Sequence, residues 1–172
     1  MPGEEAFATL ETNEGHFLNG GVNSSYNPSD REMFLRKIDG TNGDTIWNRA
    51  YEFTGYQSVT DMDSTYDGGA ILAGYSSPGY SDFMLVKVDS TGNREWSQEY
   101  GSAGWSYEYA DGDTIWTRIL PGDYDYDIVQ MQDYDYFIVG RINRHYTGVD
   151  IHLVRTDENG DAAKPVSTGR GI

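Results

Sequence analysis

An internal repeat restricts the possible folds of this chain more than any other feature of its sequence. The central copy runs from Asp67 to Trp96 and reads DGGAILAGYSSPGYSDFMLVKVDSTGNREW. A second copy runs from Asn13 to Trp47 and a third from Tyr134 to Asp161. The positions that the copies share are Gly20, Gly74 and Gly140; Leu35, Leu85 and Leu153; Lys37, Lys87 and Arg155; Asp39, Asp89 and Asp157; and Gly43, Gly92 and Gly160. So many shared positions predict several copies of one structural unit.

The spacing of the copies predicts a single repeat domain over residues 1–172. Lys37 and Lys87 are 50 residues apart, whereas Lys87 and Arg155 are 68 apart. We place the units at about 5–53, 56–101 and 123–166, with a degenerate insertion at 102–122. Within this insertion GDTIWTR nearly repeats the GDTIWNR that begins at Gly43, so we interpret it as part of a fourth unit.

Each unit is predicted to consist of β-strands. The segments AILAGYS and FMLVKVD are short, rich in aliphatic and aromatic residues, and bounded by Asp, Gly and Ser. The run FMLV is apolar on both sides, which predicts a strand buried on both faces between neighbouring sheets. A period near 50 residues with about four strands favours propeller blades. The predicted fold class is therefore all-β, a β-propeller-like array of about three to four four-stranded blades.

The motif in the central copy also resembles a known family. The pattern D-G-G-x-I-L-x-G-Y-S-S, followed by D-x-x-L-V-K-x-D-x-x-G-x-x-x-W, is similar to the repeats of the seven-bladed β-propeller repeat family of bacterial and archaeal surface proteins. The resemblance implies an extracellular or cell-surface protein and supplies no catalytic residues. The opening MPGEEAFATL contains no visible leader.

Composition restricts the partners. The formal net charge is −16, from 28 Asp plus Glu against 12 Lys plus Arg, and such a surface repels the phosphates of nucleic acids. No apolar stretch is long enough for a membrane-spanning helix, so no membrane insertion is expected. The chain has no cysteine, which excludes disulfides and thiolate chemistry.

An aromatic segment is the first candidate binding site. Aromatic rings present apolar faces with a polar rim, which suits both carbohydrates and protein partners. The candidate ligand-binding residues are Trp105, Tyr107, Tyr109, Trp116, Tyr124 and Tyr126. The alternative is that these rings pack between strands as ordinary β-sheet residues.

Two acidic clusters are candidate metal sites. In a strand, Asp123, Asp125 and Asp127 would share one face, and Asp157, Asn159 and Asp161 resemble the start of a calcium-binding loop. The second cluster lacks the later bidentate Glu and aligns with the plain turns of the other copies, so the turn interpretation is favoured. Any Ca²⁺ binding is expected to be weak, and no other cofactor is predicted.

No catalytic motif is visible. His16 and His152 align with Ala70 and Met84 of the central copy, which indicates structural roles, and no nucleophile, zinc or phosphate-binding motif is present. The leading hypothesis is therefore a non-enzymatic, propeller-like surface module for adhesion, glycan or protein binding, or assembly. A structural subunit of a polymer or ring and a cryptic acidic glycoside hydrolase remain alternatives. The third copy lacks the Trp-bearing strand, so its exposed edge favours a homo-oligomer over the alternative, a monomeric ring that the insertion at 102–122 completes with a small fourth blade.

Overall fold

The computed structural model describes residues 3–27, 30–53, 55–77, 82–100, 127–144 and 148–162. These residues form eleven β-strands and no helix, and the strands belong to three antiparallel sheets. The prediction of an all-β fold is confirmed.

Each sheet is a meander in which consecutive strands are neighbours. Sheet A contains β1 (Glu4–Glu11), β2 (Phe17–Asn27), β3 (Asp30–Ile38) and β4 (Thr45–Tyr51). Sheet B contains β5 (Tyr56–Ser64), β6 (Ala70–Ser77), β7 (Asp82–Val88) and β8 (Arg94–Tyr100). Sheet C contains β9 (Asp127–Gln130), β10 (Tyr136–Arg144) and β11 (Gly148–Thr156). A bridge between Thr156 and Ala162 repeats the pair Val88–Arg94, at which β8 begins.

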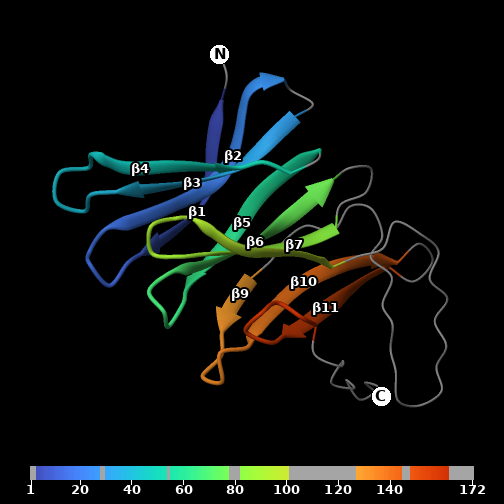
Figure 1. The fold of residues 1–172 in the computed structure, drawn as a ribbon. Helices are drawn as coiled ribbons and strands as arrows, with labels where there is room; N and C mark the ends of the chain where they lie inside the picture. The colour runs from blue at the N-terminus through green and yellow to red at the C-terminus, as the bar shows by residue number, and fades with distance from the viewer. Residues whose placement is uncertain are drawn as a thin grey trace.

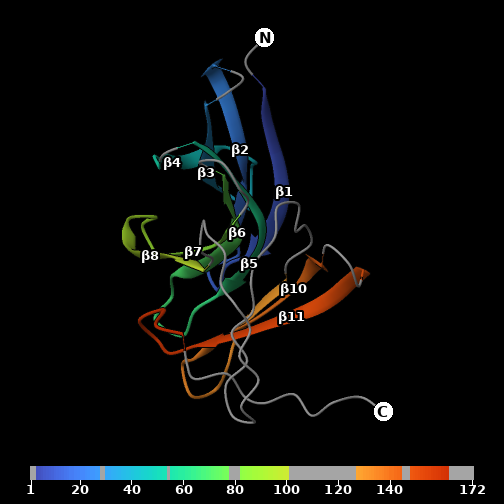
Figure 2. The same cartoon turned by 90° about the vertical axis from the view of Figure 1, so that its right-hand side faces the viewer.

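The three sheets follow one another through the molecule in chain order (Figures 1 and 2). The first strand of sheet B, β5, contacts the first strands of both other sheets, β1 and β9. The described sheets do not close on themselves.

Two apolar cores lie between successive sheets, and β7 contributes to both. Its Met84, Val86 and Val88 side chains join the core shared with sheet A, while Phe83 and Leu85 join the core shared with sheet C. All five are at most 2% exposed, so each stabilises the fold by roughly 1.5–3 kcal/mol. The predicted burial of this strand on both faces is confirmed.

The glycine column predicted from the sequence is wrong by one residue in the first copy. Gly74 and Gly140 each pair with the residue that precedes the shared leucine, Met84 and His152. In sheet A the residue in that register is Gly21, whereas Gly20 pairs with the leucine itself. The same shift makes Phe17, not His16, the counterpart of Ala70.

The close approach of two backbones explains why glycine is required at Gly21 and Gly74. A Cβ atom at Gly21 would lie 1.9 Å from the carbonyl oxygen of Glu5, and one at Gly74 would lie 1.9 Å from that of Ser58. Both contacts lie beside a β-bulge in the first strand of the sheet. A side chain larger than hydrogen would push the two strands apart.

Candidate functional site

A cation in the third strand of each sheet pairs with an acid in the first hairpin turn of the same sheet. The pairs are Lys37–Glu14, Lys87–Asp67 and Arg155–Asp133, with N–O distances of 2.7, 2.7 and 2.6 Å. The cations were predicted as a column, but their partners were not. The sequence does contain a signal for these acidic partners, because each acid comes just before the residue with positive φ in its turn: Gly15, Gly68 and Tyr134.

The two lysines differ in how completely their charge is neutralised. Lys87 Nζ also lies 2.7 Å from Glu95 Oε2 and donates to the carbonyl oxygen of Val88 at 3.1 Å. In sheet A the position of Glu95, just before the tryptophan, is occupied by Ile46. Among the described side chains, Lys37 therefore pairs with one carboxylate, that of Glu14, which is 67% exposed.

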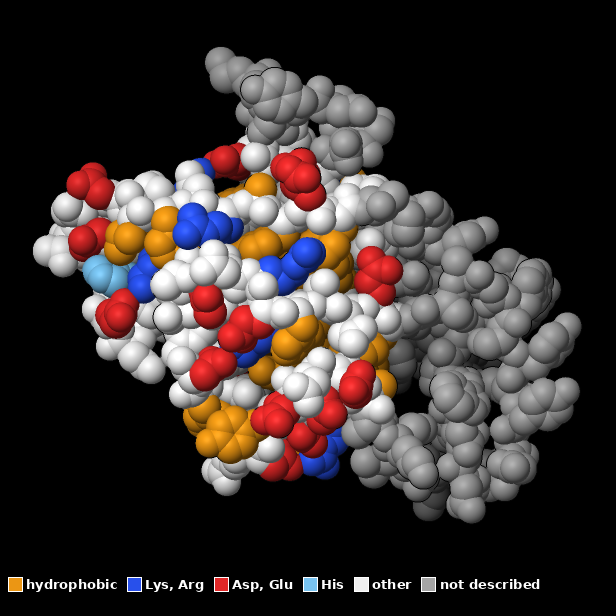
Figure 3. All heavy atoms as spheres, viewed as in Figure 1, with side chains coloured by type: hydrophobic (Ala, Val, Ile, Leu, Met, Phe, Trp, Pro, Cys, Tyr) orange, Lys and Arg blue, Asp and Glu red, His pale blue; other side chains and the backbone are white. Residues whose placement is uncertain are grey.

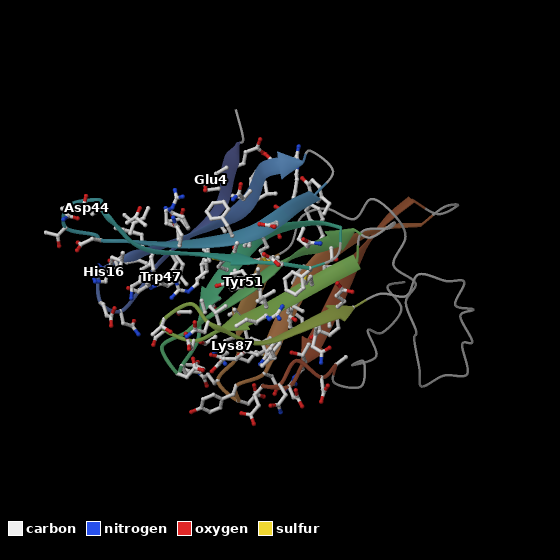
Figure 4. The ribbon with its side chains drawn as sticks, turned by 45° about the horizontal axis from the view of Figure 1, so that its top comes forward. Glu4, His16, Asp44, Trp47, Tyr51 and Lys87 are labelled. Carbon is white, nitrogen blue, oxygen red and sulfur yellow. The ribbon has the colours of Figure 1, made fainter. Side chains whose placement is uncertain are left out.

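The fourth strands of sheets A and B hold the next sheet through an aromatic contact that we call the latch. On β4, the Tyr51 hydroxyl donates to the carbonyl oxygen of Gly92 at 2.8 Å, and the Trp47 ring is so close that a Cβ at Gly92 would lie 2.6 Å from it. Figure 4 shows both side chains between the two sheets. Burial raises the pKa of Tyr51, so its hydroxyl remains neutral and donates.

The same latch recurs between sheets B and C. The Tyr100 hydroxyl donates to the carbonyl oxygen of Gly160, and a Cβ at Gly160 would lie 2.7 Å from the Trp96 ring. Burial raises the pKa of Tyr100 as well. The tryptophan column is thus an inter-sheet contact.

A cavity of about 130 Å³ lies between sheets A and B, beside the Lys37–Glu14 pair. Its apolar side is formed by Leu10, Leu18 and Trp47. The rest of the lining is rich in polar side chains, among them Thr12, Asn13, Ser64, Thr65, Asp89 and Ser90. We call this cavity the A/B pocket.

The carboxylates of the A/B pocket are ionised at neutral pH. The hydrogen bond from Lys37 lowers the pKa of Glu14. The pKa of Asp89 is lowered to about 2, first by the hydrogen bond from the Thr91 hydroxyl and then by the backbone N–H of Asn93. The pocket thus offers a cationic donor in Lys37 and an anionic acceptor in Glu14, whereas both carboxylate oxygens of Asp89 already accept hydrogen bonds from Thr91 and Asn93.

The corresponding place between sheets B and C is filled by a side chain. Tyr136 is 1% exposed and packs edge-to-face against Trp96, with ring centroids 5.8 Å apart. Its counterpart in sheet B is Ala70, because Ala70 pairs with Val88 and Ser64 as Tyr136 pairs with Thr156 and Gln130. Sheet B thus carries a methyl group, next to the pocket-lining Gly69, where sheet C carries this ring.

Most of the predicted site residues lie outside the described residues. This applies to Trp105, Tyr107, Tyr109, Trp116, Tyr124, Tyr126, Asp123 and Asp125. Asp127 is exposed at the start of β9.

The residues Asp157, Asn159 and Asp161 form a hairpin turn. Asp157 Oδ1 accepts the backbone N–H groups of Asn159 and Asp161, both at 2.9 Å, just as Asp89 accepts those of Thr91 and Asn93. Within the described part of the chain, no group of three or more His, Asp or Glu side chains is placed to hold a metal ion.

Two aspartates of β5 hold β9 against sheet B. Asp61 Oδ2 accepts the Ile128 N–H at 2.9 Å, and Asp63 Oδ2 accepts the Gln130 N–H at 3.0 Å. Burial raises the pKa of Asp61, and a hydrogen bond with the Asp127 side chain adds to this effect. Sequence reasoning missed these residues because they belong to no shared column.

The surface and the comparisons with known proteins add little about partners. Acidic side chains are spread over the face seen in Figure 3, between smaller apolar patches. Within the described residues there is no helix with the length and apolar character needed to cross a bilayer. No model of a known protein family matches the chain, and no curated protein matches it. The resemblance to propeller repeats therefore stays a prediction.

Proposed function

We propose that this chain is a non-enzymatic, propeller-like module of the cell surface or extracellular space that binds a ligand in the A/B pocket. The propeller-like arrangement is supported by three successive sheets of equivalent topology, whose first strands contact one another and whose latches repeat. The surface location is supported by the resemblance to surface-protein repeats and by the acidic composition.

The A/B pocket is the observation that carries the proposal. Filling a cavity normally stabilises a protein, and this protein fills the equivalent place between sheets B and C with Tyr136. A purely structural array would gain stability from the same filling between sheets A and B. The unfilled interface, with a lysine and a tryptophan beside it, is what a binding site requires.

The carboxylates of the A/B pocket favour binding over catalysis. A general acid needs a pKa near the working pH, but the pKa values of Glu14 and Asp89 are both lowered. Glycoside hydrolysis also needs one carboxyl that stays protonated. The described carboxyl whose pKa is raised, that of Asp61, lies away from the A/B pocket, between sheets B and C, where it accepts a backbone N–H of β9.

On the free face of sheet A, a charged residue stands where sheet B has an apolar one, as expected in a terminal repeat. Arg36 on this face pairs with Glu4 at 2.6 Å and donates to Asn48 at 2.6 Å. Its counterpart in sheet B is the fully buried Val86. We propose that sheet A ends the array, so the homo-oligomer predicted from the sequence would form through another surface; light scattering that finds only monomer at micromolar concentration would contradict that oligomer.

A ligand screen by nuclear magnetic resonance tests the binding function. ¹⁵N-labelled protein is mixed with monosaccharides, amino acids and small phenols, and the indole N–H of Trp47 and the amides of residues 12–15 are followed. We expect at least one compound class to shift these signals in a saturable way. The proposal fails if none of the compounds binds, or if every saturable shift maps away from the A/B pocket.

A further inference from the structure

The A/B pocket results from a series of small residues rather than from a single replacement. Around the first hairpin turn of the following sheet, sheet B carries small side chains where sheet C carries large ones. The matched pairs are Ser64 and Gln130, Gly68 and Tyr134, Gly69 and Asp135, and Ala70 and Tyr136. Ser64, Gly68 and Gly69 line the pocket, and Ala70 is next to Gly69 in the chain.

Tyr136 shows what kind of group fits such a place. Its six-membered ring contacts Trp96 at 5.8 Å with an angle of 64° between the rings. Its hydroxyl accepts a hydrogen bond from Gln130 Nε2 at 3.3 Å. The A/B pocket, at about 130 Å³, is close in size to cavities of roughly 150 Å³ that bind a benzene-sized ring. One six-membered ring is thus the occupant that the geometry suggests.

The polar lining indicates a ring with several hydroxyl groups. A phenol has one hydroxyl, and one partner is enough for it, as Gln130 is for Tyr136. The A/B pocket instead presents the Lys37 ammonium, the Glu14 carboxylate and the side chains of Asn13, Ser64 and Ser90. Asp89, Thr12 and Thr65 also line it, but they already hydrogen-bond within their own turns. A ring with hydroxyl groups can bond to the first set, whereas an apolar ring would bond to none of them.

Charge argues against an anionic ligand. The described ionised groups that line the A/B pocket are one cation, Lys37, and two anions, Glu14 and Asp89. Lys37 is already paired with Glu14 at 2.7 Å, and the whole protein is strongly acidic. An anionic ligand would be repelled, whereas hydroxyl groups donate well to ionised carboxylates.

We propose that the A/B pocket binds one pyranose ring of a neutral glycan, in the place that Tyr136 occupies between sheets B and C. This inference rests on the proposed binding function. An apolar C–H face of the sugar packs against Trp47, Lys37 donates to a sugar oxygen, and Glu14 accepts from sugar hydroxyls. Ala70 is the position that keeps the site open.

The experiment titrates wild-type protein and variants with methyl pyranosides of neutral sugars and, in parallel, with p-cresol. Ala70→Tyr restores the ring found between sheets B and C and should abolish sugar binding. Glu14→Gln keeps the shape of an exposed side chain and should weaken binding about tenfold, the size expected for a hydrogen bond to a charged group. Asp133→Asn makes the same change beside Arg155 in the first hairpin turn of sheet C, which contributes no residue to the lining of the A/B pocket, and should leave binding unchanged.

The outcomes separate the sugar class from the binding function. Sugar binding that is lost in Ala70→Tyr and weakened in Glu14→Gln, but not in Asp133→Asn, supports the inference. Binding of p-cresol alone, lost in Ala70→Tyr, overturns the pyranose assignment and leaves the proposed binding function intact. Sugar binding that both pocket variants retain overturns the site. If Ala70→Tyr loses its β-sheet circular dichroism spectrum, the comparison of Glu14→Gln with Asp133→Asn decides.

Discussion

The interface between sheets A and B and the interface between sheets B and C use the same latch but differ in their first strands. In β1, Ala8 and Leu10 pack into the apolar core against sheet B. The same positions in β5 are Asp61 and Asp63, and their carboxylates hold the backbone of β9. The first interface is thus apolar at the first strand and hollow near the hairpin turns, whereas the second is polar at the first strand and filled near the turns.

This difference shows how a repeat protein separates scaffold from function. The latch recurs in successive units, because each sheet must be held by its neighbour. The Lys–acid pair also recurs, and it joins the third strand to the first hairpin turn within one sheet. The side chains that fill the space between the sheets are free to differ, since apolar burial needs volume rather than a particular residue. A ligand site can therefore be opened in one interface without loss of the array.

The largest loss of stability is expected when the ring that fills the interface between sheets B and C is removed. Tyr136→Ala removes a ring that is 1% exposed and should lower the free energy of unfolding by about 3–5 kcal/mol, because it leaves a cavity against Trp96. Urea unfolding followed by Trp fluorescence measures the change. A loss below about 1 kcal/mol would show that the two interfaces are equally hollow and would break the comparison.

The contribution of the latch to stability can be measured by replacing three glycines that share a positive φ near 80°: Gly43, Gly92 and Gly160. Gly43→Ala should cost about 1–2 kcal/mol from backbone strain alone, since nothing lies within 4 Å of its added methyl group. Gly92→Ala and Gly160→Ala should each cost about 1–3 kcal/mol more, because the methyl group collides with Trp47 or Trp96. Equal losses in all three variants would mean that the tryptophan contacts contribute nothing.

Much of the fold was predictable because its signals are local. The Asp–Gly turns after the third strand and the doubly apolar FMLV segment predicted the strands directly, and both occur as expected. The register of β2 was not predictable, because Gly20 and Gly21 stand side by side in the sequence and only the bulge in β1 decides which one faces the backbone.

The candidate site was missed for a different reason. Aligning the copies emphasises what they share, whereas the A/B pocket lies where the copies differ, with small residues from Ser64 to Ala70 in place of the larger ones from Gln130 to Tyr136. The roles of Glu14 and Asp67 were readable in principle from their place in the turns, but their pairing with the lysine column joins residues at least 20 positions apart. The aromatic and acidic segments that drew attention lie mostly outside the described residues.

The polar first strand of the second interface should make stability depend on pH. Burial raises the pKa of Asp61 above that of the unfolded chain, so its contribution is fully present below the ordinary Asp pKa and is lost as pH rises through the raised value. Asp61→Asn keeps an oxygen for the Ile128 N–H and should gain up to about 1 kcal/mol over wild type at pH 7 but not at pH 3, after allowance for the partly solvated site. Thermal unfolding at both pH values measures this, and a difference that is the same at both would contradict the assignment.

The smallest change in stability is expected in the first hairpin turn of sheet C, where a tyrosine occupies the position that is glycine in the first turns of sheets A and B. Tyr134 has φ 71°, whereas the matching residues of the other turns are Gly15 and Gly68. A left-handed conformation costs a non-glycine residue about 1–2 kcal/mol, and the edge-to-face contact between Tyr134 and Tyr66, with centroids 5.3 Å apart, returns about 0.5–1.5 kcal/mol.

Tyr134→Gly should therefore stabilise the protein by only about 0.5 kcal/mol, the small difference between these two effects. In a Tyr66→Ala background the ring contact is already absent, so the same replacement should stabilise by the full strain of about 1–2 kcal/mol. Comparing the four proteins by urea unfolding isolates the ring contact from the backbone strain. If Tyr134→Gly has the same effect in both backgrounds, the Tyr66–Tyr134 contact does not help to close the second interface, and the contrast with the open A/B pocket rests on Tyr136 alone.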